Sequence, residues 1–385
     1  MQRLFLLILL LSALPAHAVP LTLPDGVTVT GYLETSYTHD FSEPPAGVML
    51  LRSFDNRSDM FLLENAVVDV AIDRERIMGR LALQIGQTPN SYYRAELTQP
   101  GGTGVGLSSA DTWKFLQQAW LGVHLDEAGQ WTAQAGLFLS PIGPETVAVK
   151  ENWNWSRSNL FTALPYYHLG VRLNFQPVPE WTLTAALYNG WNAVVDVNGG
   201  KSVSLQSAWA GKKVQASLLY FGGTERPEPA RAEGNPWRHL VDAWAQVQVL
   251  DWLAFMLHVD GGFEDTELQG GNNRASWLGV ALYGRAQLPL NLALAARVDT
   301  LSERRAQDVN GAYSQAFLLP VSRLSSATGT LEWKPSTHLL LRAEARLDGS
   351  LGDAFASGPT TLVNGEPLAN AHQRLTTTLG AVANF

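Results

Sequence analysis

The 385-residue chain has no cysteine, so disulfide bonds cannot stabilise its fold. Charged residues make up 16% of the chain, whereas roughly 25% is usual in a soluble globular protein. After the N-terminal region no apolar run of eighteen residues occurs, which excludes a bundle of transmembrane helices. A chain with so little charge and no apolar blocks must distribute its apolar residues finely, and alternation along β-strands does this.

The chain also lacks the residue clusters that carry most chemistry. Its formal net charge is -8, and no basic patch offers itself to phosphate groups, so we expect no nucleic-acid partner. The histidines are scattered, and none has a metal-ligand spacing on a helix. His258 and Asp260 share a strand face, but no serine is identifiably paired with them. We therefore predict no catalytic residue, cofactor or metal site, and a protein that is not an enzyme.

The N-terminus has the features of an export signal. Arg3 precedes an apolar run of about ten residues, and a small-x-small site follows at Ala16-His17-Ala18. The run is too short to span a bilayer as a helix. We expect residues 1–18 to be a signal peptide cleaved before Val19, and residues 19–385 to form a single transmembrane domain in the cell outer membrane.

Alternating strands account for most of the remaining chain. In the last segment, TTTLGAVANF, apolar residues recur at every second position back from Phe385, which indicates a β-strand. Segments with this pattern are predicted as strands at 27–40, 60–73, 77–87, 112–125, 131–140, 166–175, 181–191, 201–210, 214–222, 237–249, 252–263, 274–288, 292–301, 323–334, 339–348 and 373–385.

The connections between these segments alternate in length. Short turns such as RER, GKK, PLN and PSTH alternate with longer polar segments such as 88–111, 141–165, 302–322 and 349–372. Outer-membrane barrels combine short periplasmic turns with long extracellular loops, and their last strand pairs with the first so that no edge meets lipid. The predicted fold class is therefore all-β, a closed antiparallel transmembrane β-barrel of about sixteen strands.

The alternation also assigns side chains to the two faces of the wall. The apolar positions, which we expect to meet lipid, include Leu81, Leu83, Ile85, Leu137, Leu139, Leu169, Val171, Leu173, Leu253, Phe255, Leu257, Leu339, Leu341 and Leu347. Charges on the lipid face cost about 2–4 kcal/mol at mid-bilayer, so the charges between them must face water. The predicted pore-lining residues of the strands are Arg80, His168, Arg172, Asp242, Arg285, Arg297, Asp299, Arg342, Glu344 and Arg346, with Glu34, Asp69, Glu332 and Arg374 on the same face.

Two smaller sets of residues carry specific expectations. Tyr166, His168 and Arg172 lie on one lumen face and could together bind an anion, but we favour a simple polar wall position for His168. Aromatic residues mark the short-turn ends of the strands, where they predict a membrane-interface girdle on the periplasmic side; they are Trp131, Trp181, Trp252, Trp333 and Phe385.

Four stretches resemble a known family of Gram-negative outer-membrane proteins, the OmpL-like β-barrel porins. They are LRSFDNRSDMFLLENA, GLFLSPIGPETV, KENWNWSRSNLFTALPYYHLGVR and LYNGWNAVVDVNGGKSV. The resemblance covers most of 28–210, and the remainder shares only strand rhythm and the terminal Phe385, which is similar to the assembly signal of such barrels. It implies outer-membrane lipid and the barrel assembly machinery as partners, and transport as an inference without a named solute.

A barrel of about sixteen strands encloses a lumen wide enough for water, whereas about eight strands are filled by their own side chains. We therefore expect a porin for passive diffusion of small hydrophilic solutes or ions, with a homo-oligomer left open. The alternative is a barrel that acts as an adhesin, receptor or hydrolase through its extracellular loops.

The segment 141–165 follows the fifth predicted strand, and in general porins the loop at this place folds into the lumen. By that analogy Glu145, Glu151 and Arg157 would set the constriction, while Trp153 and Trp155 brace the segment against the wall. In the alternative interpretation, the tryptophans anchor the segment outside the barrel and its charges are solvated.

Overall fold

A computed structural model describes residues 23–96, 109–196, 198–225, 236–265, 274–307, 319–360, 362–363 and 366–385. Sixteen strands form one closed antiparallel barrel, in which neighbours in sequence are neighbours in space. They are β1 Val27–Asp40, β2 Phe61–Arg74, β3 Ile77–Ile85, β4 Leu116–His124, β5 Trp131–Leu139, β6 Tyr167–Val178, β7 Trp181–Tyr188, β8 Ser202–Ala210, β9 Val214–Thr224, β10 Trp237–Leu250, β11 Leu253–Asp265, β12 Arg274–Leu288, β13 Leu292–Arg304, β14 Arg323–Ser336, β15 Leu339–Ser350 and β18 Gln373–Asn384.

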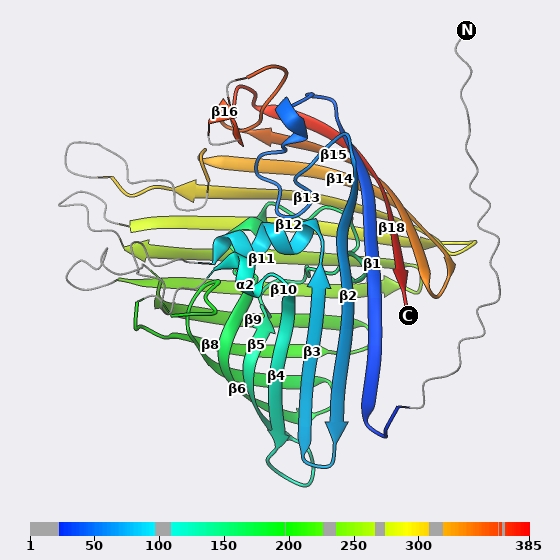
Figure 1. Cartoon of the computed structure of the whole chain (residues 1–385), viewed down its shortest axis with the longest axis vertical. Coiled ribbons are helices and arrows are strands. Elements are labelled where there is room, and N and C mark those ends of the chain that lie inside the picture. The colour runs from blue at the N-terminus through cyan, green and yellow to red at the C-terminus, as the bar shows by residue number, and fades with distance from the viewer. Residues whose placement is uncertain are drawn as a thin grey trace.

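The first and last barrel strands close the ring. β1 pairs with β18 from Tyr32 opposite Asn384 to Asp40 opposite Thr376, and the two strands lie side by side in Figure 1. Phe385 extends the contact, because its N–H donates to the Gly31 carbonyl at 3.1 Å. Every barrel strand therefore has two hydrogen-bonded neighbours, which leaves no edge exposed to lipid.

The predicted strands are confirmed, with shifts at their ends. The largest shift is in the predicted strand 112–125, which begins at Leu116 because the short helix α2, Ala110–Trp113, precedes it. The hydroxyl of Ser109 caps α2 by accepting the N–H of Asp111 at 3.1 Å. Another short helix, α1 Gln87–Tyr92, follows β3, and a two-stranded ribbon of β16 Leu362–Val363 and β17 Glu366–Pro367 precedes β18. The predicted signal peptide lies outside the described residues.

The two faces of the wall follow the predicted alternation, with one exception. Leu81, Leu83 and Leu257 are about half exposed on the outside of the barrel, as expected. Leu137 was predicted to meet lipid, and this is wrong, since its side chain is only 2% exposed. It belongs to an apolar cluster with residues of the long connections, among them Tyr93, so these connections cover the strand here.

The aromatic residues predicted at the short-turn ends are all exposed on the surface. Trp209 at the end of β8 is also exposed and lies directly opposite Trp181. The sequence analysis missed Trp209, although it precedes a short turn as Trp333 does. The assignment of these rings to a membrane interface stays a prediction. In the described part of the chain, none of the helices is long and apolar enough to span a membrane.

Candidate functional site: a segment held inside the barrel

Residues 141–165, the inward segment, cross the interior of the barrel between β5 and β6. Their backbone contacts side chains of β1, β10, β13 and β15 on the far wall. The segment contains two short 3-10 helices, Val149–Glu151 and Leu160–Ala163. The segment lies inside, so the interpretation that anchored it outside the barrel is wrong.

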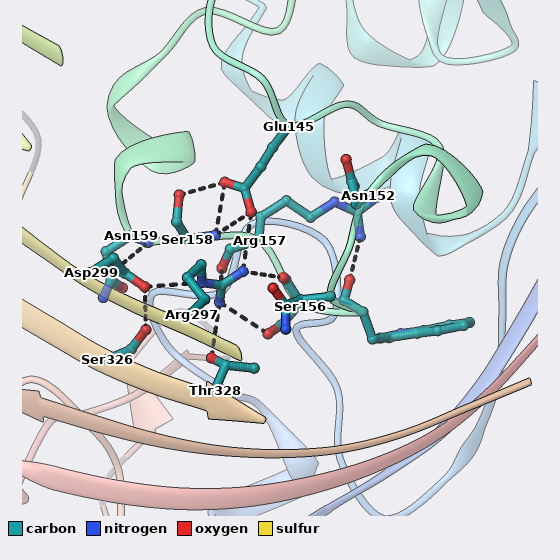
Figure 2. Close-up of polar contacts among 12 residues, drawn as sticks. Glu145, Asn152, Ser156, Arg157, Ser158, Asn159, Arg297, Asp299, Ser326 and Thr328 are labelled. Atoms are coloured by element: carbon teal, nitrogen blue, oxygen red, sulfur yellow. Dashed lines mark hydrogen bonds and ion pairs between the residues drawn. The ribbon is translucent and has the colours of Figure 1, made fainter. Parts of the chain in front are cut away.

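Arg297 of β13 is the centre of one set of attachments (Figure 2). Its guanidinium donates to the carbonyl oxygens of Ser156 at 2.6 Å and Arg157 at 3.1 Å. It also contacts the carboxylates of Asp299 and Glu145, each at 3.1 Å. The side chain is fully buried, so this dense set of charge-assisted bonds offsets the cost of removing the cation from water.

Arg342 of β15 makes a second set of attachments further along the segment. It donates to the carbonyl oxygens of Val149 at 2.9 Å and Asn154 at 3.0 Å, and also to that of Asn152. Its partner on the wall is Glu332, at 2.7 Å. The single guanidinium of Arg342 thus satisfies three backbone carbonyls of the segment.

Wall carboxylates hold the N–H groups of the same segment. Glu344 accepts the N–H of Trp155 at 2.6 Å and that of Ser156 at 3.0 Å. The same arrangement recurs for Glu34 with Val149 at 2.6 Å, Asp299 with Asn159 at 2.9 Å, and Asp242 with Gly143 at 3.1 Å. Arginines of the wall therefore donate to carbonyls of the segment, and carboxylates of the wall accept from its N–H groups. Together they satisfy the backbone polar groups of a buried loop.

Apolar side chains of the segment fit where the wall has glycine. Trp155 is 1% exposed and packs against Gly380 of β18, where a Cβ would lie 2.2 Å from the ring. Leu160 packs in the same manner against Gly279 of β12. Both close approaches require a residue without a side chain on the strand.

The charges of the segment do not occupy the positions expected from the sequence. Arg157 is buried, and it donates to the segment's own carbonyls at Thr146, 3.2 Å away, and at Trp155, 3.1 Å away. Glu145 is also buried, and it accepts the N–H of Ser158 at 3.0 Å. The expectation that these two charges face a water-filled constriction is wrong, because they fasten the segment to itself and to Arg297. Glu151 is exposed and pairs with Lys150 at 2.5 Å.

Most predicted pore-lining side chains of the strands point into the barrel but do not meet open water. The inward segment and neighbouring side chains cover His168, Asp242, Arg297, Asp299, Arg342, Glu344 and Arg346, all of which are buried. The expectation that these groups face water is therefore wrong, since alternation identifies a face but not what covers it. Arg80 and Arg285 keep 42% and 23% of their side-chain surface and pair with Asp69 and Glu332.

His168 and Arg172 do not form the anion site considered above. The Nδ1 atom of His168 lies 3.1 Å from the Gly190 carbonyl, and its ring stacks on Tyr188 with centroids 4.4 Å apart. Arg172 lies over the ring of Phe138, 3.7 Å from its centroid. Burial raises the pKa of Tyr166 to about 12, so this hydroxyl is neutral. These groups form part of the packed wall and loop interface.

A second cluster at the outer mouth was not predicted from the sequence. Arg52 lies in the connection between β1 and β2. Its guanidinium contacts the carboxylates of Asp55 at 2.9 Å and Asp348 of β15 at 3.3 Å. It also donates to the Thr376 hydroxyl at 2.7 Å. A cavity of about 750 Å³ lies next to it. Its lining includes Leu51, Arg52, Arg57, Gln87, Asn90 and Arg94. The signal for Asp348 was present in the alternating run LRAEARLD, but nothing local marked Arg52 as its partner.

The chain matches one protein-family model over residues 26–385, the family described as "Putative beta-barrel porin-2, OmpL-like". The chain belongs to this family. The membership agrees with the resemblance found in the sequence. It extends that resemblance beyond residue 210, where the sequence analysis had recognised only the succession of strands and the terminal Phe385. As an OmpL-like barrel, the protein is assigned to the outer membrane by its family and fold.

Solved structures with the same fold are distant in sequence. A loop-deletion mutant of the outer-membrane protein OmpT of Vibrio cholerae has a TM-score of 0.59 at 10% identity, covering 94% of this chain and 100% of that one. The outer-membrane channel DcaP of Acinetobacter baumannii has a TM-score of 0.55 at 12% identity, with 93% and 97% covered. An anion-selective porin from Comamonas acidovorans has a TM-score of 0.55 at 11% identity, with 93% and 99% covered. No curated protein sequence matches the chain. At these identities the structures establish the fold alone.

Proposed function

We propose that this OmpL-like barrel is an outer-membrane porin through which small hydrophilic solutes or ions diffuse passively. The observation that carries the proposal is the inward segment: a sixteen-strand barrel is wide, and the segment between β5 and β6 narrows it. A barrel used only as a scaffold for outer loops has no need of a segment fastened across its interior by buried arginines. Membership in a family of β-barrel porins supports the same assignment.

The distribution of accessible charge indicates a route. In the proposed path, solutes enter at the polar cavity beside Arg52 and Arg57, pass the inward segment, and leave past Arg80, Arg285 and Lys334. Many lumen charges are bound to the segment and others pair with one another, so few remain to bind a solute strongly. We therefore propose a narrow, weakly selective channel without catalytic activity.

Conductance across planar bilayers tests this proposal. Protein purified in detergent should insert and produce discrete conductance steps, small for a barrel of this strand number because the segment fills much of the lumen. The same preparation denatured by heat before addition is the control and should give no steps. A folded barrel that inserts but remains electrically silent would contradict the porin assignment and favour an adhesin, receptor or hydrolase.

The proposal includes export and assembly. We propose that residues 1–18 are removed before Val19, that the barrel assembly machinery inserts the chain, and that copies of the barrel associate into a homo-oligomer. One solved structure of the V. cholerae protein OmpT is described as a trimer form, which supports considering this state. Intact-mass measurement of the outer-membrane form and cross-linking in native membranes test cleavage and oligomerisation separately.

A further inference from the structure

Three buried side chains on the inner face of β10 and β11 gather potential metal ligands at one point. Asp242 and Asp260 are directly opposite each other across this hairpin, and His258 lies two residues before Asp260. Each residue offers one ligand atom, and these atoms all lie within 4.8 Å of one another. None of the three side chains is more than 1% exposed.

Hydrogen bonds satisfy only part of this cluster. His258 Nε2 lies 2.5 Å from Asp242 Oδ2, and Asp242 Oδ1 accepts the N–H of Gly143 at 3.1 Å. The Nδ1 atom of His258 and both carboxylate oxygens of Asp260 have no hydrogen-bond partner within normal distance among the described residues. The indole of Trp277 is the polar group that faces Asp260. Two buried carboxylates beside one imidazole thus leave lone pairs of His258 and Asp260 unsatisfied.

We propose that Asp242, His258 and Asp260 bind a divalent transition-metal ion, for which zinc is the best match. Zinc accepts mixed imidazole and carboxylate ligands about 2.0–2.2 Å from the ion, whereas Ca²⁺ and Mg²⁺ prefer oxygen ligands alone. The three ligand atoms lie within 4.8 Å of one another, and rotation of the side chains must bring them into such a sphere. The ion takes the place of the proton between His258 and Asp242, and that proton leaves to solvent together with any proton carried by Asp260. Two carboxylates, a neutral imidazole and one divalent cation then sum to zero charge.

The site also connects the wall to the inward segment. Asp242 uses one oxygen for the metal and keeps the other for the Gly143 N–H, an outer-shell bond that orients a ligand. Gly143 has a φ of 78°, and a Cβ there would lie 3.3 Å from the His258 ring. Binding of the ion should therefore stabilise the folded barrel together with the first residues of the segment.

Metal content and thermal stability of the purified barrel test the proposal. The protein in detergent is washed with EDTA, equilibrated with zinc chloride, desalted and analysed for metal by mass spectrometry. We expect about one zinc ion per chain and a higher melting temperature than in the EDTA-treated sample. A wild-type barrel that retains no zinc under these conditions overturns the proposal, whatever the variants do.

Variants show whether the zinc lies at this site. Asp260→Asn and His258→Gln should each lower zinc affinity by at least about tenfold. Asp40→Asn is the matched control, because Asp40 is a buried carboxylate of β1 outside this cluster, and it should bind zinc as the wild type does. Zinc retained equally in Asp260→Asn and His258→Gln would locate it elsewhere and overturn the assignment. Displacement of zinc by excess Mg²⁺ would contradict a mixed nitrogen and oxygen site.

Discussion

The indole ring of Trp155 lies against Gly380, so close that a Cβ atom on residue 380 would come within 2.2 Å of it. Trp155 sits in the middle of the inward segment, and Gly380 lies in the strand that closes the barrel. The N–H of Trp155 is held by Glu344 at 2.6 Å on the adjacent strand β15. Two contacts therefore hold the segment against the closing strands. The Trp155 ring packs against Gly380, and the backbone N–H of Trp155 donates to Glu344.

Filling that gap should displace the segment. Gly380→Ala places a methyl group into the Trp155 ring, and overpacking of this kind costs typically about 1–3 kcal/mol. We expect a lower melting temperature and larger or noisier single-channel steps. Gly329→Ala in β14 is the control, because no atom lies within 4 Å of a Cβ at that position. Equal melting temperatures and equal conductance steps in the two variants would show that packing of Trp155 against Gly380 does not hold the segment.

Removing the charge of Glu344 should loosen the same contact by a different route. In Glu344→Gln, the amide NH₂ must face an N–H of Trp155 or Ser156 or the Thr330 hydroxyl, which leaves a buried donor unsatisfied at a cost of about 1–3 kcal/mol. Trypsin should then cleave the folded barrel after Lys150 faster than it cleaves the wild type. Urea unfolding in detergent measures the loss of free energy.

Asp69→Asn is the matched control for Glu344→Gln. Asp69 is also an acid of the barrel wall, but it pairs with Arg80, at 2.5 Å, rather than with the inward segment. Cleavage after Lys150 should stay at the wild-type rate in this variant. If Asp69→Asn accelerated cleavage as much as Glu344→Gln, the effect would be one of wall charge in general.

Ion selectivity should depend on charges that remain accessible. Lys334 keeps 47% of its side-chain surface and lies 3.5 Å from Glu332. Lys334→Glu should shift the reversal potential, measured under a salt gradient, toward the equilibrium potential of the cation. The shift should be largest at low salt, where screening is weak. Lys212→Glu changes the net charge equally in the exposed turn between β8 and β9 and should shift it less. A larger shift from Lys212 would argue against the proposed route.

The terminal aromatic residue should matter for assembly more than for conduction. Phe385 exchanges two backbone hydrogen bonds with Gly31, at 3.1 and 3.2 Å, and its side chain is 67% exposed. Deletion of Phe385 should reduce the amount of folded barrel in the outer membrane, while channels that do form keep the wild-type conductance. Phe385→Tyr preserves an aromatic ring and serves as the control. Normal abundance of the truncated chain would remove the assembly role.

The barrel was predictable from the sequence because its determinants are local. Period-two alternation assigns the face of each residue, and the turns between alternating runs fix where strands end, so LRAEARLD alone places Arg342, Glu344, Arg346 and Asp348 on the inner face. The register of the hairpin was not predictable in the same way, because an irregularity between Gln248 and Leu250 is what brings Asp242 opposite Asp260. Spacing rules written for one helix or loop cannot detect ligands that come from paired strands.

By itself the sequence determined the strands, their order, the closure of the ring and which side chains point inward, because hydrogen bonding between neighbouring strands follows from pattern and turn length. The tertiary structure alone decided what the inward charges do. Arg342 binds the carbonyl of Asn152, 190 residues earlier in the chain, and the same crossing segment buries Arg297 and Glu344. Such contacts depend on the path of an irregular segment through the barrel, and that path is set by the whole wall at once rather than by any pattern near the segment.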